Sequence, residues 1–319
     1  MSVLVYTETE QGKFKKSAFE VASYGSALAE KMGADASAIA FNAEDAGAIG
    51  NYGIGKVLQV SDASFESFTA AKYAKAIAAA ARQENATVVV LSSSANSKYL
   101  APLLAVELEA GYASNVIALP EDVSNFKVKR NAFTNKAYAY SAISSDIKMV
   151  GVSNNSFGVT EKGGSAAVDS FVPDASADGV SVDGQDKAAG KVTIADADIV
   201  VSAGRGLKGP ENWNMVEELA DVLGAATACS KPVSDMGWRP HSEHVGQTGK
   251  PVASNLYIAI GISGAIQHLA GINSSKVKVV INTDPEAPFF KAADYGVVGD
   301  AFTVVPQLIE KLKAFKAAG

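Results

Sequence analysis

Residues 244–271 read HVGQTGKPVASNLYIAIGISGAIQHLAG, in which an apolar run, LYIAI at 256–260, lies between two polar clusters that carry glycine. The clusters are VGQTG at 245–249 and GISGAIQH at 261–268. A short apolar run bounded by such turn signals predicts a buried central strand. Loops this poor in large side chains indicate that something comes close to their backbone.

The rest of the second half alternates strands with helices. Further strands are expected at 197–204, 226–233 and 276–282, and helices at 211–224, 263–271 and 302–315. Gly224 ends the first of these helices, Ser263 is a natural N-cap of the second, and Pro306 is tolerable near the first turn of the third. Strands that alternate with helices of this length predict a parallel, doubly wound sheet.

The first half shows the same alternation. Strands are expected at 2–6, 36–41, 56–60 and 87–92, helices at 17–33, 67–83 and within 92–111, and further β segments at 114–120, 132–143 and 147–153. The later β segments are not all separated by helices, so we expect part of this sheet to be antiparallel. The predicted fold class is therefore α/β, with two doubly wound, Rossmann-like domains.

The composition changes between residues 158 and 190, where glycine, serine, aspartate and alanine dominate. We interpret this stretch as a boundary region with an exposed strand or two. It divides the chain into an N-terminal nucleotide-binding-like α/β domain at 1–187, with a linker at its end, and a C-terminal α/β domain at 188–319.

Composition also limits the function. The chain has 319 residues, 48% of them hydrophobic and 19% charged, with a net charge of −6 and a pI near 5.2. These values are typical of a globular protein, and the negative net charge argues against a nucleic-acid partner. The chain lacks an apolar run of about twenty residues, and its N-terminus, MSVLVYTETE, lacks the features of a targeting peptide. We expect a protein of the bacterial cytoplasm that is not embedded in a membrane.

Cysteine and histidine are scarce. Cys229 is the single cysteine, which excludes an internal disulfide and a cysteine-based metal cluster. His241 and His244, with Glu243 between them, supply only two imidazoles and no third ligand at a recognised spacing. We therefore expect no metal site, and we interpret Cys229 as a small buried residue rather than a redox-active thiol.

Four loops of the second half follow strands, where ligands of open α/β sheets bind. The segment 202–212 holds Arg205 between glycines, and the segment starting at Ser263 offers free backbone N–H groups for a pyrophosphate. The segment that starts at Ser263 is not a G-x-G-x-x-G loop, and the acidic residue that binds the ribose of NAD is missing. The sequence therefore argues against an NAD-dependent dehydrogenase. Each loop also has a purely structural interpretation. Ser263 suits an ordinary helix N-cap, and Arg205 suits a surface position in a connecting loop.

The other two loops carry amide, hydroxyl and carboxylate groups. Gln247 and Thr248 lie between Gly246 and Gly249, which permit close backbone approach. Asn282 at a strand end and Asp300 beyond a later β run suit hydrogen bonds to ribose or adenine. The alternatives are a hairpin-like turn for the first loop and, for Asp300, a cap of the last helix.

From residue 204 to 306 the sequence closely resembles the α subunits of the electron-transfer flavoprotein family. The resemblance is carried by GRGLK at 204–208, VGQTGK at 245–250, LYIAIGISGAIQHLAG at 256–271, INTDPEAPFF at 281–290 and ADYGVVGDAF at 293–302. In the first half, VLVYTE at 3–8 and YLAPLLAVELEAG at 99–111 are similar to the family's N-terminal domain. The resemblance covers nearly the whole chain.

The resemblance implies a heterodimer in which the C-terminal domain of this chain binds FAD, and in which a β subunit carries AMP or a second FAD. It assigns to the cofactor the residues Arg205, Ser230, Lys231, Val245, Gly246, Gln247, Thr248, Ser263, Gly264, Ala265, Ile266, Gln267, His268, Asn282, Asp300 and Ala301. Among these, Ser263 would hold the pyrophosphate, and Asn282 and Asp300 the adenosine end. Thr248 would lie near flavin N5, and His268 near the N1–C2=O edge.

Two of these residues bear on the reduction potential. A donor or a cation at His268 would stabilise the negative charge of a reduced flavin, whereas a solvent-facing helix residue would not. Lys231 stands where most members of the family have an arginine stacked on the flavin ring, and a lysine lacks that planar stacking surface. Arg239, eight residues later, is an alternative source of a guanidinium.

The resemblance implies an electron carrier rather than an enzyme with its own substrate. It would accept electrons from dehydrogenases, such as the acyl-CoA dehydrogenases of fatty acid β-oxidation, and pass them to a quinone oxidoreductase in the membrane. The alternatives are an electron-bifurcating flavoprotein that uses NADH, and a flavin-free nucleotide-binding interaction module. In the first domain, SSSANSK at 92–98 lies where a phosphate loop would, or only caps a helix, and we expect this domain to serve as a scaffold and to dock the β subunit.

Overall fold

The computed structural model describes residues 2–133, 135–174, 179–180, 182–184, 193–194 and 197–318. The chain divides into two compact units, the first formed by 1–132 and 137–186 and the second by 133–136 and 187–319. The domain boundary predicted between residues 187 and 188 lies outside the described residues.

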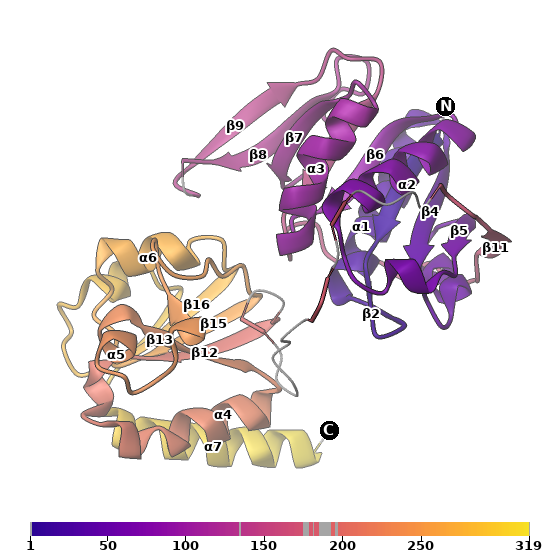
Figure 1. Ribbon diagram of the computed structural model, residues 1–319. Coiled ribbons are helices and arrows are strands. Elements are labelled where there is room, and N and C mark those ends of the chain that lie inside the picture. The colour runs from indigo at the N-terminus through magenta and orange to yellow at the C-terminus, as the bar shows by residue number, and fades with distance from the viewer. Residues whose placement is uncertain are drawn as a thin grey trace. The chain divides into compact units, whose positions relative to one another are not determined.

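The first unit is built on a nine-stranded sheet with the strand order β11-β5-β4-β1-β6-β10-β7-β8-β9 (Figure 1). Its strands are β1 (Ser2–Thr7), β4 (Asp35–Phe41), β5 (Lys56–Val60), β6 (Ala86–Ser92), β7 (Gly111–Val116), β8 (Lys127–Ala132), β9 (Ala137–Ala142), β10 (Lys148–Val152) and β11 (Ala167–Ser170). A two-stranded hairpin, β2 (Thr9–Glu10) and β3 (Lys13–Phe14), stands apart from it. The pairs from β11 to β7 are parallel, whereas β8 and β9 pair antiparallel, which confirms a mixed sheet.

The single β segment predicted at 132–143 is wrong, because the structure divides it between β8 and β9. Phe133 and Asn135 take positive φ angles of 51° and 58°, and the N–H of Lys136 donates to the carbonyl of Phe133. Asparagine tolerates this conformation, so the chain turns here instead of continuing. Strand β8 begins at Lys127 in a stretch whose charged residues hide the alternation, with only Val128 fully buried.

Helices cover both faces of the first sheet. Helix α1 (Lys16–Met32) packs on one face through residues such as Val21 and Leu28, and it ends at Gly33 in the left-handed conformation, as predicted. Helices α2 (Ala70–Gln83) and α3 (Ala95–Glu107) pack on the other face.

The serine-rich segment before α3 is occupied by internal contacts. The N–H of Ser97 donates to Oγ of Ser94, which caps the helix. The hydroxyls of Ser92, Ser94 and Ser97 all donate to Oε1 of Glu8, which follows β1 and is 2% exposed. Of the two sequence interpretations of this segment, the structure shows the capping one.

The second unit is an all-parallel, six-stranded sheet with the order β14-β13-β12-β15-β16-β17. Its strands are β12 (Ile199–Ala203), β13 (Ala226–Ser230), β14 (His244–Val245), β15 (Leu256–Ile260), β16 (Val277–Asn282) and β17 (Tyr295–Val298). In chain order the sheet therefore reads 3-2-1-4-5-6, and the order reverses between β12 and β15. Ligands of doubly wound sheets bind in the crevice that such a reversal opens.

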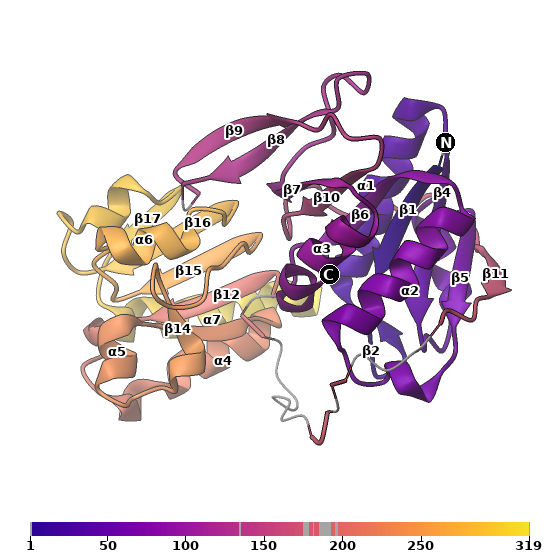
Figure 2. The ribbon, with the colours of Figure 1, turned by 45° about the horizontal axis from the view of Figure 1, so that its top comes forward.

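Helices flank this sheet too. Helices α4 (Asn214–Leu223) and α7 (Ala301–Ala318) contact each other and cover one face through Val216, Leu219, Val305 and Ile309 (Figure 2). Helix α6 (Ile266–Ile272) packs on the other face. The strand predicted at 226–233 is too long, because Lys231 and Pro232 begin the short helix α5 (Lys231–Asp235), where proline suits the first turn.

The predicted N-cap at Ser263 is wrong. Helix α6 begins only at Ile266, after Ala265, and no side chain caps it. The carbonyl of Ser263 instead accepts a hydrogen bond from the N–H of Phe289, and Gly264 has a φ of 84°. These contacts keep residues 261–265 as a loop that lies over the sheet edge.

The two glycine-bearing clusters of the opening stretch pack against each other. The N–H of Gln247 donates to the carbonyl of Gln267 at 2.7 Å. A Cβ built on Gly271 would lie 2.6 Å from both the N and the Cα of Gly246, closer than real Cβ contacts come. Small residues are therefore needed in these clusters partly because the two segments of the chain pack closely against each other.

We expect Gly271→Ala to destabilise the second unit by about 1–3 kcal/mol, since the new methyl group has to displace the backbone at residue 246. Urea unfolding followed by circular dichroism measures the change. Gly55→Ala is the control, because its Cβ would meet no heavy atom closer than 3.8 Å. Equal stability of Gly271→Ala and the wild type would contradict the close packing of these loops.

Candidate functional site

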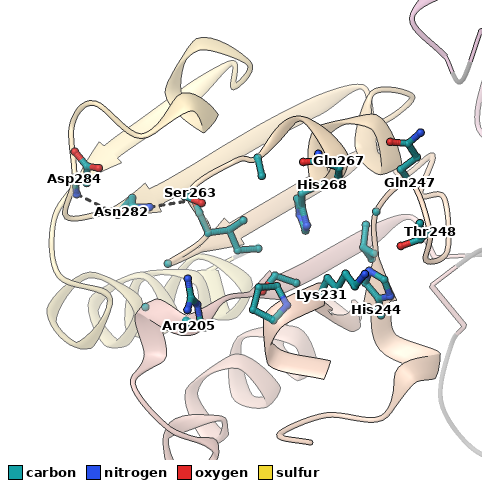
Figure 3. Close-up of a pocket in the computed structure, with 18 residues that line it drawn as sticks. Arg205, Lys231, His244, Gln247, Thr248, Ser263, Gln267, His268, Asn282 and Asp284 are labelled. Atoms are coloured by element: carbon teal, nitrogen blue, oxygen red, sulfur yellow. Dashed lines mark hydrogen bonds between the residues drawn. The ribbon is translucent and has the colours of Figure 1, made fainter. Parts of the chain in front are cut away.

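A pocket of about 770 Å³ lies at the carboxyl edge of the second sheet (Figure 3). Its walls come from the ends of β12, β13, β14, β15 and β16 and from the start of α6. The lining residues are Arg205, Gly206, Ser230, Lys231, Pro232, His244, Val245, Gly246, Gln247, Thr248, Gly261, Ile262, Ser263, Ala265, Gln267, His268, Asn282 and Asp284. Most of the residues predicted from the sequence are thus brought together around one pocket.

Four of the predicted residues do not line the pocket: Gly264, Ile266, Asp300 and Ala301. Asp300 caps α7, because its Oδ1 accepts from the N–H of Phe302 at 3.0 Å. Gly264 packs against Phe289, and Ile266 is 65% exposed. The capping alternative for Asp300 therefore describes this structure.

Two loops touch through their backbones where the strand order reverses. The N–H of Gly206, after β12, donates to the carbonyl of Gly261, after β15, at 3.1 Å. A Cβ on Gly206 would lie 2.6 Å from Cα of Gly261, so neither position accommodates a side chain. This contact holds the loop of Arg205 beside the loop of Ser263.

Arg205 supplies a cation to the pocket. Its side chain is exposed, extends into the pocket in Figure 3, and makes no ion pair with another described residue. A guanidinium without an internal partner offers a planar set of donors to an anion.

Lys231 supplies the second cation, and Arg239 does not. Arg239 donates from Nε and Nη2 to both carboxylate oxygens of Glu243, at 2.8 and 2.6 Å, and from Nη1 to Glu217 at 3.1 Å. Its guanidinium also lies 5.4 Å from the ring centroid of Trp213. The sequence alternative in which Arg239 replaces the missing arginine is therefore wrong in this structure, and the exposed Lys231 lines the pocket instead.

His268 is buried and neutral. It is 7% exposed, so the solvent-facing alternative is excluded. Burial lowers the pKa of His268 to about 4, repulsion from His244 adds to this shift, and the backbone of Val245 opposes it. At neutral pH the imidazole is therefore a neutral hydrogen-bonding group of the pocket and not a cation.

The sequence interpretation missed His244, which it weighed only as a metal ligand. His244 is 1% exposed and lines the pocket, and burial lowers its pKa, with His241 adding to the effect. In the part of the chain that the structure describes, no group of three or more histidine, cysteine or acidic side chains is placed to hold a metal ion. The signal that marks His244 is its position directly before VGQTG, at the end of a strand.

Cys229 lies within the core below the pocket. Its side chain is fully buried, and burial raises the pKa of the thiol to about 12. A thiol with such a pKa is protonated at neutral pH, so it is not a nucleophile or redox partner there.

The pocket combines two cations, amide and hydroxyl groups, and two buried imidazoles whose Nδ1 atoms have no hydrogen-bond partner. Buried polar atoms normally find partners, so unpaired ones at a pocket wall indicate a polar ligand. The set suits an elongated ligand with an anionic part and a heteroaromatic part.

His268 makes a pH-dependent contribution to stability. The unfolded chain takes up a proton near its usual pKa of 6.5, whereas the folded chain does so only near 4. Between these pH values the unfolded state binds more protons than the folded state. The free energy of unfolding is therefore highest above pH 6.5 and falls as the pH is lowered to 4. We expect a loss of at most about 3 kcal/mol, from 1.36 kcal/mol per pH unit.

Urea unfolding of the ligand-free chain at pH 7 and pH 5 measures this loss. His268→Asn should show a clearly smaller difference between the two pH values than the wild type. His241→Asn, at an exposed histidine, is the control and should keep the wild-type difference. An unchanged difference in His268→Asn would show that His268 is not buried as a neutral group.

Comparison with known proteins agrees with this architecture. Residues 3–176 match the family model of the electron transfer flavoprotein domain, and residues 193–273 match that of the electron transfer flavoprotein FAD-binding domain. The chain is 36% identical over 317 residues to the electron transfer flavoprotein subunit alpha of Bacillus subtilis, covering 98% of this chain and 97% of the relative. It is 38% identical over 325 residues to that of Paracoccus denitrificans, covering 98% and 100%.

A third relative, the subunit alpha of Syntrophomonas wolfei, is 36% identical over 318 residues, with 97% of this chain and 98% of the relative covered. Both family models match, and the relatives align over nearly the whole chain at 36–38% identity, which together identify its family. The chain belongs to the electron transfer flavoprotein α-subunit family, whose members are electron carriers.

Proposed function

We propose that this chain binds FAD in the pocket of its second unit and carries electrons between partner proteins. The observation that carries the proposal is the gathering of Arg205, Lys231 and the buried, neutral His268 around one crevice at the reversal of strand order. The matched FAD-binding family model spans all three.

The residues present fit this cofactor. A dinucleotide needs cations or free N–H groups for its phosphates, and Arg205 supplies a cation without an ion-pair partner among the described residues. Lys231 adds a second positive charge to the same pocket. A flavin ring presents nitrogen and oxygen atoms to its surroundings, and the unpaired Nδ1 atoms of His244 and His268 would meet such atoms. When bound, the flavin accepts and releases the electrons, and the protein residues orient it and tune its potential.

Each group then has a distinct role. Arg205 and the backbone after Ile262 would hold the pyrophosphate, Asn282 would hold the adenosine end, and Thr248 would contact the flavin ring. Asn282 is held in place by donating to the carbonyl of Ile262 at 3.0 Å, which couples two loops of the pocket. Lys231 provides positive charge without the stacking plane of an arginine.

The partners follow from the family. An α subunit pairs with a β subunit, and we propose that the pair accepts electrons from dehydrogenases such as acyl-CoA dehydrogenases, in the cytoplasm, and delivers them to a membrane quinone oxidoreductase. Within its described residues the chain has no helix that meets the length and apolarity needed to cross a membrane.

The first unit offers a surface for the β subunit. Tyr99, Leu103 and Val106 lie on one face of α3 and are 72%, 43% and 78% exposed. Tyr138 and Tyr140 of β9 are 65% and 48% exposed. Exposed apolar side chains on one helix face are typical of a protein interface, so we propose that the β subunit docks on the face of α3.

The flavin content of the purified heterodimer tests the main proposal. We expect one FAD per heterodimer, measured by absorption after release. Two FAD would favour the electron-bifurcating alternative, and no flavin after reconstitution would favour the flavin-free module.

Arg205→Gln should weaken FAD binding on the order of tenfold, because a charge-assisted hydrogen bond to a phosphate is lost. Fluorescence titration of the flavin-free heterodimer measures the affinity. Lys208→Gln is the matched control, since Lys208 is an exposed cation three residues away that does not line the pocket. Equal affinities of the two variants would argue against a phosphate at Arg205.

Val106→Asp should weaken the pairing with the β subunit on the order of tenfold, because a charge would replace an apolar contact. Sedimentation at several concentrations measures the dissociation constant. Phe315→Asp, at a side chain of α7 that is 78% exposed, is the control and should pair normally. The docking surface is misplaced if Val106→Asp pairs as tightly as the wild type.

A further inference from the structure

A fully buried tyrosine contacts the imidazole of the pocket from below. Oη of Tyr257, on the central strand β15, lies 2.9 Å from Nε2 of His268 on α6. Tyr257 is 0% exposed, and its ring is stacked on Phe289 at an interplanar angle of 8°. The core therefore holds the phenol in one position beneath the imidazole.

The direction of this hydrogen bond decides where the imidazole carries its proton. A neutral imidazole has one N–H donor and one nitrogen acceptor. If Nε2 donated to the tyrosine, the buried phenol proton would need a second acceptor. Nε2 is the partner at normal hydrogen-bond distance, and the buried hydroxyl of Ser202 also acts on the phenol oxygen. Ser202 makes no other side-chain hydrogen bond, so its own proton would be left unpaired if it accepted from the phenol. The arrangement that leaves no buried donor unpaired is Oη–H donating to Nε2.

The other ring nitrogen then carries the proton. Nδ1 of His268 is buried without a hydrogen-bond partner, and the residue lines the pocket, with its side chain extending from α6 into it in Figure 3. The backbone of Val245 acts on the imidazole, but Nδ1 makes no hydrogen bond of normal geometry with it. A buried N–H left in this way is costly, so an acceptor atom of the ligand would complete it.

We propose that Tyr257 is a positioning residue that fixes His268 as a neutral Nδ1–H donor toward the ligand of the pocket. Its consequence for a bound flavin rests on the proposed function. A fixed N–H donor strengthens its hydrogen bond as negative charge grows on the acceptor, so it favours the reduced cofactor over the oxidised one.

The ionisation states around the pair agree with this arrangement. Burial raises the pKa of Tyr257 well above its usual value, so the phenol keeps its proton. The groups whose charges act on His268 are few: His244 lies across from it on β14, and its own pKa is lowered by burial. Both imidazoles are thus neutral near pH 7, and a single N–H points from each ring.

The chain has only three histidines, so selective ¹⁵N labelling of histidine gives a spectrum that can be assigned with single variants. The experiment uses the full chain together with its β subunit, first without flavin. We expect Nδ1 of His268 to show the shift of a protonated, pyrrole-like nitrogen and Nε2 that of an unprotonated, pyridine-like one. A wild-type protein with the proton on Nε2 would overturn the proposal.

Tyr257→Phe removes only the hydroxyl and keeps the stacking on Phe289, so we expect it to fold. In this variant the Nδ1–H form should no longer dominate. Tyr295→Phe, at a tyrosine that is 67% exposed, is the matched control and should leave the spectrum of His268 unchanged. An Nδ1–H form that persists unchanged in folded Tyr257→Phe would also overturn the proposal.

The flavin-loaded heterodimer gives a second readout. Tyr257→Phe should lower the ratio of the affinities for reduced and oxidised flavin on the order of tenfold, which for one electron equals about 59 mV in potential. A changed tautomer with an unchanged potential would support the role of Tyr257 in fixing the proton and would contradict the placement of the flavin beside His268. Failure of the wild-type heterodimer to bind flavin would refute the proposed function, while the flavin-free spectra would still decide the role of Tyr257.

Discussion

The backbone contact between Gly206 and Gly261 is the constraint on which the geometry of the pocket depends. It joins the loops that follow β12 and β15, the two strands between which the order of the sheet reverses. A side chain at either position would separate these loops, because a Cβ would come within 2.7 Å of the opposite backbone. With the loops in contact, Arg205 and Ser263 face one crevice although they are far apart in the chain.

A second contact of the same kind explains the stretch at 244–271. Gly271 lies so close to the backbone of Gly246 that position 271 does not admit a Cβ, and residue 247 is held by the start of α6. The small residues of VGQTG and GISGAIQH are therefore needed for two reasons. They let the chain pack on itself, and they leave the pocket open to a ligand. A sequence pattern cannot separate these reasons, because both place the same demand on side-chain volume.

The polar chemistry of the pocket comes from burial. His268 carries no charge at neutral pH because its side chain is buried on α6 against Tyr257, and His244 is buried on β14. The cations, by contrast, are exposed, and the charge of Lys231 helps to lower the pKa of His244. The exposed charges of the site therefore attract an anion. Its buried donors are neutral, and the core fixes their orientation.

The order of strands and helices could be predicted from sequence, since it depends on local periodicity and on glycine signals such as Gly33 and Gly224. Errors arose where a distant contact overrode a local signal. Ser263 does not cap α6, because its carbonyl binds Phe289, and the segment 132–143 turns back on itself to form a hairpin with β8. For Asp300 the sequence left two roles open, a hydrogen bond to ribose or adenine and a cap of the last helix.

The sequence by itself determined the α/β class, the family and the loops that form the pocket, because these depend on residue order and local pattern. The tertiary structure alone decided that Arg239 is held by Glu217 and Glu243, that His244 belongs to the pocket, and that Tyr257 contacts His268. The physical reason is that hydrogen-bond partners and protonation states depend on burial and on groups brought together from distant parts of the chain, and no local pattern records either of them.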